Sequence, residues 1–151
     1  MNSALKQIRQ ALITAMQTIT TGNGYSLTLS NTKRYATVTP EFLSTSKDSD
    51  YPKWCVVTEK GVDQPQPSQR VTASVNFVAA VILIAANKTD ATLQDKIEDV
   101  VDDVRRMCRA NDTLGGTVTE IEVLEFATDS GSLFPEASAE IRIKVSYEMQ
   151  F

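Results

Sequence analysis

The chain of 151 residues contains no histidine. Histidine is the commonest general base near neutral pH, the usual partner of a catalytic serine or cysteine, and the commonest zinc ligand. Its absence removes most nucleophilic and zinc-dependent mechanisms at once, although a carboxylate enzyme or a Ser-Lys pair stays open. We therefore expect a protein that is not an enzyme.

Cysteine is also scarce, and the two cysteines present stand far apart. Cys55 falls in a predicted strand and Cys108 on the apolar side of a predicted helix. Neither has another cysteine at the spacing that metal sites use. Both are expected to be buried, reduced thiols that pack as small apolar side chains. No metal and no other cofactor is implied.

Long apolar runs and an excess of positive charge are missing as well. The apolar run at residues 77–86 is about half as long as a membrane-spanning helix requires. Residues 1–20 have no continuous apolar core, so we expect no signal peptide. The net charge is −4 and the basic residues are dispersed, which disfavours non-specific binding to nucleic acid. We expect a soluble protein with no membrane or direct nucleic-acid partner.

The hydrophobic pattern that is present predicts a single α+β domain spanning residues 1–151. Apolar residues at helical spacing predict two amphipathic helices, over residues 3–20 and 91–110. Apolar stretches and apolar-polar alternation predict strands over residues 25–29, 34–38, 53–58, 70–87, 117–128 and 139–150. This order predicts a mainly antiparallel, or mixed, β-sheet with both helices packed on it.

Several short segments are expected to interrupt these elements. Residues 59–61 are interpreted as a turn, and the two prolines within residues 63–68 argue against a central strand. Residues 30–52 are interpreted as a surface loop. Leu114-Gly115-Gly116 is expected to end the second helix, and Asp129-Ser130-Gly131 to turn between the last two strands.

The second helix carries the densest group of acidic residues, namely Glu98, Asp99, Asp102 and Asp103. Carboxylates three and four residues apart share a helix face and could hold Mg²⁺ or Ca²⁺. Such runs are usually solvated, and Arg106 can pair with Asp102 or Asp99 along the same helix. We favour the solvated helix face.

Two aromatic residues at the start of a predicted strand also allow two interpretations. Tyr51 and Trp54 could form a patch on which a ligand stacks. An aromatic side chain beside a strand start is more often part of the core or of an interface. We favour the core or interface role.

Two strand surfaces could carry subunit contacts. Residues 78–86 are apolar on both faces, so they need cover from a helix of the same chain or from a neighbouring subunit. On the last strand, Arg142 and Lys144 could bind an acidic partner. Cross-strand pairing of these two with Glu120 and Glu122 is the interpretation that we favour.

Short motifs follow one another along the chain in a distinctive order. They are the helix end Gly22-Asn23-Gly24-Tyr25, the Tyr51-Pro52 pair, the strand at residues 70–86, the turn Asn111-Asp112-Thr113-Leu114-Gly115-Gly116 after a helix, the segment at residues 123–131, Leu133-Phe134-Pro135, and an alternating strand ending in Tyr147. This order resembles the tail terminator proteins of long-tailed bacteriophages.

The resemblance implies a small α+β structural protein that is not an enzyme and needs no cofactor. Members of that family form a hexameric ring on the end of a completed tail tube, stop its polymerisation and present the surface that meets the head. The implied partners are other copies of the chain, the tail tube protein and a head-tail connector or neck protein. The implied location is the tail-neck junction of the virion, after synthesis in the cytoplasm of a bacterial host.

The resemblance and the burial pattern together suggest contact residues. Subunit contacts are expected at Val78, Ala80, Ile82, Ile84, Arg142 and Lys144. Tube or connector contacts are expected in the loops at residues 44–53 and 129–135, at Lys47, Asp48, Asp50, Tyr51, Asp129, Ser130, Leu133 and Phe134.

Three other functions compete with a tail terminator. Another neck or head-completion protein of the virion would share its size and composition. A small ligand-binding α+β domain would instead show a concave pocket near Tyr51 and Trp54. A carboxylate-dependent hydrolase would bind a divalent metal through Asp99 or Asp102.

Overall fold

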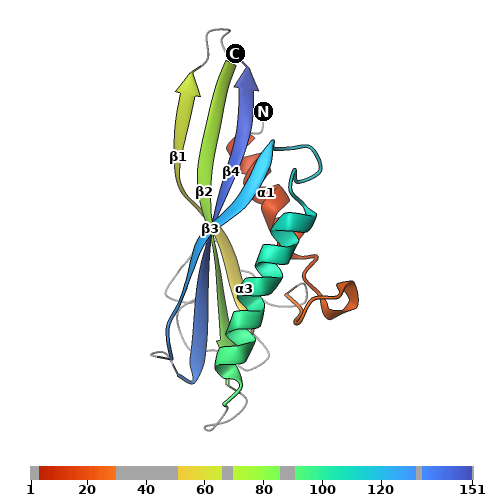
Figure 1. The fold of residues 1–151 in the computed structure, drawn as a ribbon, viewed down its shortest axis with the longest axis vertical. Coiled ribbons are helices and arrows are strands. Elements are labelled where there is room, and N and C mark those ends of the chain that lie inside the picture. Colours follow the sequence, from red (N-terminus) through yellow and green to blue (C-terminus); the bar gives the residue numbers. More distant parts are fainter. Residues whose placement is uncertain (1–3, 30–50, 66–69, 86–90, 132–133, 151) are drawn as a thin grey trace.

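The fold is an antiparallel sheet flanked by two helices (Figure 1). Our computed structural model describes residues 4–29, 51–65, 70–85, 91–131 and 134–150. Its elements are α1 (Ala4–Met16), the 3-10 turn η1 (Thr21–Asn23), β1 (Lys53–Pro65), β2 (Arg70–Ile84), α3 (Leu93–Ala110), β3 (Glu120–Thr128) and β4 (Glu136–Gln150). The strand order is β1-β2-β4-β3. The expected α+β class, with an antiparallel sheet and two helices, is confirmed.

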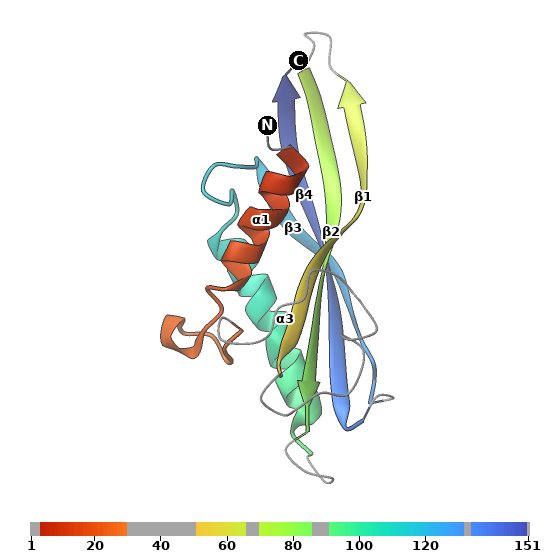
Figure 2. The ribbon, with the colours of Figure 1, turned by 180° about the vertical axis from the view of Figure 1, so that it is seen from behind.

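Both helices bury their apolar stripes against the same face of the sheet. α1 buries Ile8, Leu12, Ala15 and Met16. α3 buries all seven residues of its predicted stripe, which are Leu93, Ile97, Val100, Val101, Val104, Met107 and Cys108. Both sets belong to one hydrophobic core. The helices lie to the right of the sheet in Figure 1 and to its left in Figure 2. Each helix therefore covers part of one sheet face.

Alternation along the strands decides which residues meet the helices. β2 and β4 pair so that odd-numbered residues lie opposite odd-numbered ones, for example Phe77 opposite Ile143. These odd-numbered residues point to the helices and form the core. The even-numbered residues form the other face, which we call the outer face. Its residues are mostly polar at one end of β2, where Thr72, Ser74 and Asn76 lie.

The outer face has a small apolar cluster of its own. Cys55 from β1 and Ala80 and Ile82 from β2 are buried there, with Tyr51 and Val57 packed against them. The second half of this long strand is thus partly buried on its second face, but within the described residues the expected cover from a helix is not found there, because both helices lie on the core face. Within one chain, Ala80 and Ile82 are already shielded from solvent.

β1 is longer than the sequence pattern predicts. It continues through residues 59–61, which were expected to turn, and reaches Pro65. Two features permit this. The ladder between β1 and β2 shifts register between Thr58 and Lys60, so a bulge absorbs the extra residue. β1 also lies at the edge of the sheet and pairs with β2 on one side, so a proline there removes no hydrogen bond to a strand on the other side.

The predicted strand at residues 25–29 is wrong. Residues 25–29 form no strand with the described part of the chain, and the Leu29 amide donates instead to the Ile19 carbonyl at 2.8 Å. The predicted strands from residue 53 onward are present with shifted ends, and β4 starts at Glu136 instead of residue 139. The predicted strand at residues 34–38 and most of the expected loop at residues 30–52 lie outside the described residues.

Two other predicted turns are present, after α3 and between β3 and β4. α3 ends at Ala110 with Asn111 (φ −122°) as its C-cap, so Leu114-Gly115-Gly116 does not end the helix as expected. These three residues instead turn the chain between α3 and β3, with positive φ angles of 46°, 70° and 91°. Between β3 and β4, Ser130 and Gly131 also have positive φ, at 55° and 85°.

Candidate functional site

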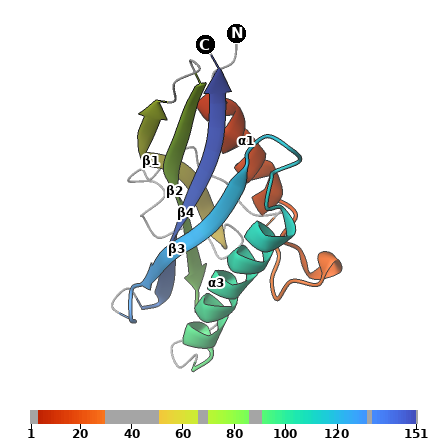
Figure 3. The same ribbon diagram turned by 45° about the horizontal axis from the view of Figure 1, so that its top comes forward.

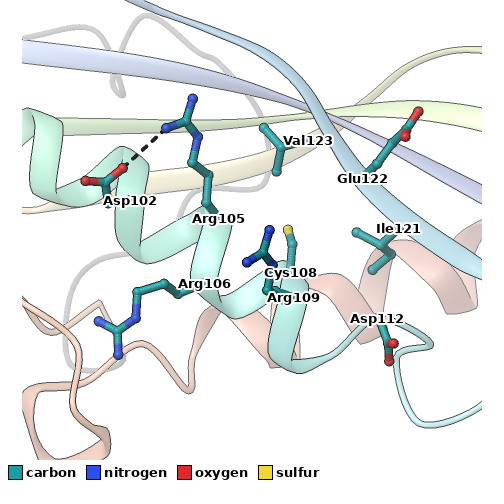
Figure 4. A pocket seen from close by; sticks show the side chains of 9 residues that line it. All are labelled: Asp102, Arg105, Arg106, Cys108, Arg109, Asp112, Ile121, Glu122 and Val123. Atoms are coloured by element: carbon teal, nitrogen blue, oxygen red, sulfur yellow. Dashed lines mark hydrogen bonds and ion pairs between the residues drawn. The ribbon is translucent and has the colours of Figure 1, made fainter.

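A groove of about 700 Å³ separates the C-terminal half of α3 from β3 (Figure 4). The helix contributes Arg105, Arg106 and Arg109 to its walls, and the strand contributes Ile121 and Val123. Figure 3 shows why the groove exists: α3 runs alongside β3, which forms the border of the sheet. The groove is therefore open along a sheet edge and is not enclosed by the core.

The charges in this groove are largely paired. Arg105 contacts Asp102 at 3.4 Å and places its guanidinium 4.7 Å from the centre of the Phe126 ring. Arg106 lies 3.7 Å from Asp103. Arg109 has no ion pair or hydrogen bond within the described part of the chain. The predicted pairing of Arg106 with Asp102 or Asp99 is therefore wrong, because both arginines pair with the aspartate three residues before them.

Asp103 has a role that the sequence interpretation missed. Its side chain is buried, and its carboxylate accepts hydrogen bonds from the backbone amides of Ser26, at 3.1 Å to each oxygen, and Leu27, at 3.2 Å. Arg106 donates to the Gly24 carbonyl at 3.0 Å and lies over the Tyr25 ring. The pair thus fastens residues 24–27 to α3. Asp103 is not part of a solvated face.

A spacing signal for this role was present in the sequence. Asp103 follows Val100 by three residues and precedes Met107 by four, which places it on the buried stripe of α3. Glu98, Asp99 and Asp102 lie on the exposed side, as expected. Among the described residues, no group of three or more potential ligands is placed to hold a metal ion.

Tyr51 and Trp54 do not form a common patch, because they lie on opposite faces of the sheet. Trp54 is in the main core, where its indole nitrogen donates to the Leu29 carbonyl at 3.1 Å. Tyr51 packs on the outer face, and its hydroxyl donates to the Glu136 carboxylate at 2.6 Å. The Lys53 ammonium lies 4.8 Å from the Tyr51 ring centre. The core interpretation is confirmed for Trp54.

The basic residues of β4 pair across strands on the outer face. Lys144 lies 3.9 Å from Glu122, as the alternation predicted. Arg142 contacts Glu125 on β3 and donates to Glu59 on β1, at 2.8 Å from Nη2. Its partners are therefore Glu125 and Glu59 in place of Glu120. The register explains the change, because Glu120 lies opposite Ser146 and the β3 bulge between Val123 and Glu125 sets Glu125 opposite Arg142.

The residues expected to make intermolecular contacts are scattered over the molecule. Of the four expected on β2, Val78 and Ile84 are partly exposed, whereas Ala80 and Ile82 are buried by the chain itself. In the last loop, Asp129 accepts from the Ser138 amide at 3.1 Å, Ser130 has positive φ, and Phe134 is exposed. Lys47, Asp48, Asp50 and Leu133 lie outside the described residues. Whether these positions contact other proteins stays a prediction.

The two edge strands carry exposed apolar side chains that the sequence interpretation missed. On β1, Val62 is 59% exposed, and on β3, Leu124 and Phe126 are each 45% exposed. An edge strand also leaves half of its backbone donors and acceptors without a partner in the sheet. Exposed apolar residues combined with an open edge define a surface suited to strand addition by another chain.

Both cysteines are buried in apolar surroundings, as the sequence predicted. Burial raises the pKa of the Cys55 thiol to about 11 and the pKa of the Cys108 thiol to about 12. A thiol whose charged form is this unfavourable is a poor nucleophile at neutral pH. Although Cys108 borders the groove, it is therefore no candidate for a reactive group.

These raised pKa values predict a loss of stability at alkaline pH. In the unfolded chain the thiols titrate near their ordinary value of 9.0, so above that pH the folded state binds more protons than the unfolded state. The contribution of the two thiols to the free energy of unfolding should consequently be constant below this value and fall as the pH rises toward about 11. Urea unfolding at about pH 8 and about pH 10 measures the difference. Cys108→Ala should weaken the dependence on pH, and an unchanged dependence would contradict this origin.

Comparison with known proteins adds no relative: no protein-family model matches the chain, and no curated protein matches it. Within the described residues, neither helix has the length and apolar character to cross a membrane.

Proposed function

We propose that this chain is a structural virion protein that forms a ring on the end of a phage tail tube. The ring ends tube polymerisation and offers the head or its connector a docking surface. Support comes from the order of motifs that resembles tail terminators. Its C-terminal part corresponds to α3, the Leu114–Gly116 turn, β3, the turn at Ser130 and Gly131, and β4.

The observation that carries the proposal is that, within the described residues, two edges of the sheet have no further strand beside them. β1 and β3 form opposite edges of one sheet, and both carry exposed apolar residues. A protein that binds a second copy through two different edges associates head to tail. Such association gives a closed ring when the rotation from one copy to the next brings the last copy back to the first. Rings of this kind need no enzymatic site.

The ring is tested by the mass of the particle in solution. Light scattering across a dilution series, with negative-stain images of the same sample, should show closed rings near six times the 16.6 kDa chain mass. Purified tail tubes should then stop growing when the rings are added. A chain that stays monomeric at every concentration, with and without tubes, would contradict the proposal. Rings that leave tube growth unchanged would favour another neck or head-completion protein.

A ligand-binding domain remains the alternative from another class, and the groove between α3 and β3 favours it. This groove is not near Tyr51 and Trp54, where a pocket was expected. It contains three arginines and also three acidic residues, Asp102, Asp112 and Glu122, so its formal charge is balanced. A ligand-binding role predicts a monomer or dimer, which the same mass measurement distinguishes from a ring.

A further inference from the structure

We propose that β1 of one copy adds to β3 of the next, so that a continuous antiparallel sheet passes from subunit to subunit. The inference rests on the proposed ring and names the surfaces that close it. The two edges lie at opposite borders of the sheet (Figure 3). The proposed contact joins β1 of one copy, between Lys60 and Gln64, to β3 of the next copy, between Glu120 and Glu125.

Strand direction is the first reason. Every neighbouring pair in the sheet is antiparallel, so in the order β1-β2-β4-β3 the two end strands run in opposite directions. When a second copy continues the sheet in the same orientation, its β1 therefore meets β3 antiparallel. The added ladder repeats the hydrogen-bond pattern already present inside the subunit.

The exposure of the two segments is the second reason. Residues 58–64 of β1 are all exposed, and Leu124 and Phe126 of β3 are half exposed. Val62 shares the outer face with Ser74, its partner on β2, and Glu122 shares that face with Lys144. Continuing the sheet therefore brings Val62 of one copy near the Leu124 region of the other. Burial of apolar surface and completion of the edge ladder act together.

The groove between α3 and β3 is the third reason, because it leaves room on the helix side of the added strand. Ile121 and Val123 border it, and Arg109 lies in its helix wall without an ionic partner in the described part of the chain. Asp63 projects from β1 on the helix side of the sheet, since its partner on β2 is Ala73. A neighbouring β1 would therefore direct Asp63 toward the groove that contains Arg109.

Charge fits this pairing on the outer face as well. β3 presents Glu120, Glu122 and Glu125 there, of which Glu122 and Glu125 already contact Lys144 and Arg142, whereas β1 presents Lys60 beside Glu59. In the register that sets Val62 opposite Glu122, the β3 bulge places Lys60 beside Glu125 and Asp63 beside Ile121. Lys60 thus adds a cation next to Glu125 on the outer face, and Asp63 is directed toward the groove on the helix side.

Pairing of identical edges fits less well. Two β3 strands related by a two-fold axis would place the glutamates of one strand opposite the glutamates of the other. Like charges directly opposite each other destabilise a sheet. Two β1 strands would leave the acidic edge of β3 and its groove without a partner. The head-to-tail arrangement alone joins the two complementary edges.

Disulfide trapping tests the contact. Partners across an antiparallel ladder have Cα atoms about 4.5–5.5 Å apart, within the range of about 4.4–6.8 Å that disulfides span. The double variant Val62→Cys with Glu122→Cys, oxidised as the assembled full chain, should form a ladder of covalent multimers on a denaturing gel. Val62→Cys with Glu120→Cys samples a register two residues away. Reducing agent should return every band to the monomer.

The matched control keeps one edge cysteine and moves the other to an interior strand. Ser74→Cys with Glu122→Cys uses the β2 partner of Val62, which a neighbouring copy cannot approach. This variant and the single variants should give no ladder. A dimer from Val62→Cys alone would show pairing of two β1 strands and overturn the inference.

Mass measurements on the same samples separate failure of the contact from failure of the ring. Rings without cross-links in both double variants would overturn the β1–β3 contact and leave the proposed function standing. A cross-linked ladder without closed rings would support the contact and contradict the ring. A monomer that never cross-links would contradict both.

Discussion

Replacing Asp103 by alanine is expected to lower the free energy of unfolding by about 2–3 kcal/mol. Asp103 is 1% exposed, and its carboxylate accepts three hydrogen bonds from the backbone amides of residues 26 and 27. Hydrogen bonds to a charged acceptor are the stronger kind, and their loss leaves backbone donors partly buried without a partner. Urea unfolding followed by circular dichroism measures the change.

Asp102→Ala is the matched control for this variant. Asp102 is the adjacent aspartate on α3, its side chain is 67% exposed, and among the described residues its ionic partner is Arg105 on the same helix. Exposed pairs of this kind contribute little, so the control should change the free energy of unfolding by about 0.5 kcal/mol or less. Equal effects from the two substitutions would show that Asp103 does not fasten the N-terminal segment to α3.

Replacing Phe77 by alanine should have the largest effect on stability, about 3–5 kcal/mol. The side chain is fully buried at the centre of β2, where it lies between Thr58 on β1 and Ile143 on β4 and faces the helices. Truncation removes apolar contacts and leaves a cavity that a sheet held on both sides cannot easily close. The midpoint of urea unfolding should fall accordingly.

Two companion variants keep this prediction testable if the truncated chain does not fold. Phe77→Leu preserves much of the volume and should cost about 1–1.5 kcal/mol. Val62→Ala removes an apolar side chain that is 59% exposed at the sheet edge, so its effect on the isolated chain should be within about 0.5 kcal/mol. A similar loss from Phe77→Ala and Val62→Ala would contradict the assignment of the core.

These stability variants also help to interpret the assembly experiments. Phe77 belongs to the core, and the buried Asp103 holds residues 24–27 on α3. Val62 and Glu122 lie on the sheet edges. A substitution at an edge that prevents assembly without lowering the free energy of unfolding therefore acts on the contact between copies. A substitution in the core changes assembly only through folding.

Much of the architecture follows from local patterns in the sequence. The seven apolar residues of α3 repeat at helical spacing, and all seven are buried. β4 alternates apolar and polar residues, and its apolar set, including Ile141 and Ile143, faces the helices. Leu114-Gly115-Gly116 forms the turn between α3 and β3 with positive φ angles. Periodicity and glycine angles are properties of neighbouring residues, so the sequence is sufficient to predict them.

The candidate surfaces depended on partners that are distant along the chain. Asp103 is buried because Ser26 and Leu27, 77 and 76 positions away, donate their backbone amides to it. Trp54 and Tyr51 separate because Trp54 packs in the main core, whereas Tyr51, which precedes β1, packs against the cluster on the outer face. β1 extends to Pro65 because it lies at an edge, and β3 is the other edge because β4 pairs with β2.

The sequence by itself therefore determined both helices, the cores of the four strands, their buried sides and the α+β class, but not every strand boundary. The tertiary structure alone decided the strand order, the two open edges and the groove between α3 and β3. The physical reason is that strands pair through backbone hydrogen bonds. These bonds are the same whether two strands are close together or far apart in the sequence, so a local pattern does not show which strands pair. Which edges remain unpaired is settled only when all four strands and both helices compete for the same apolar face.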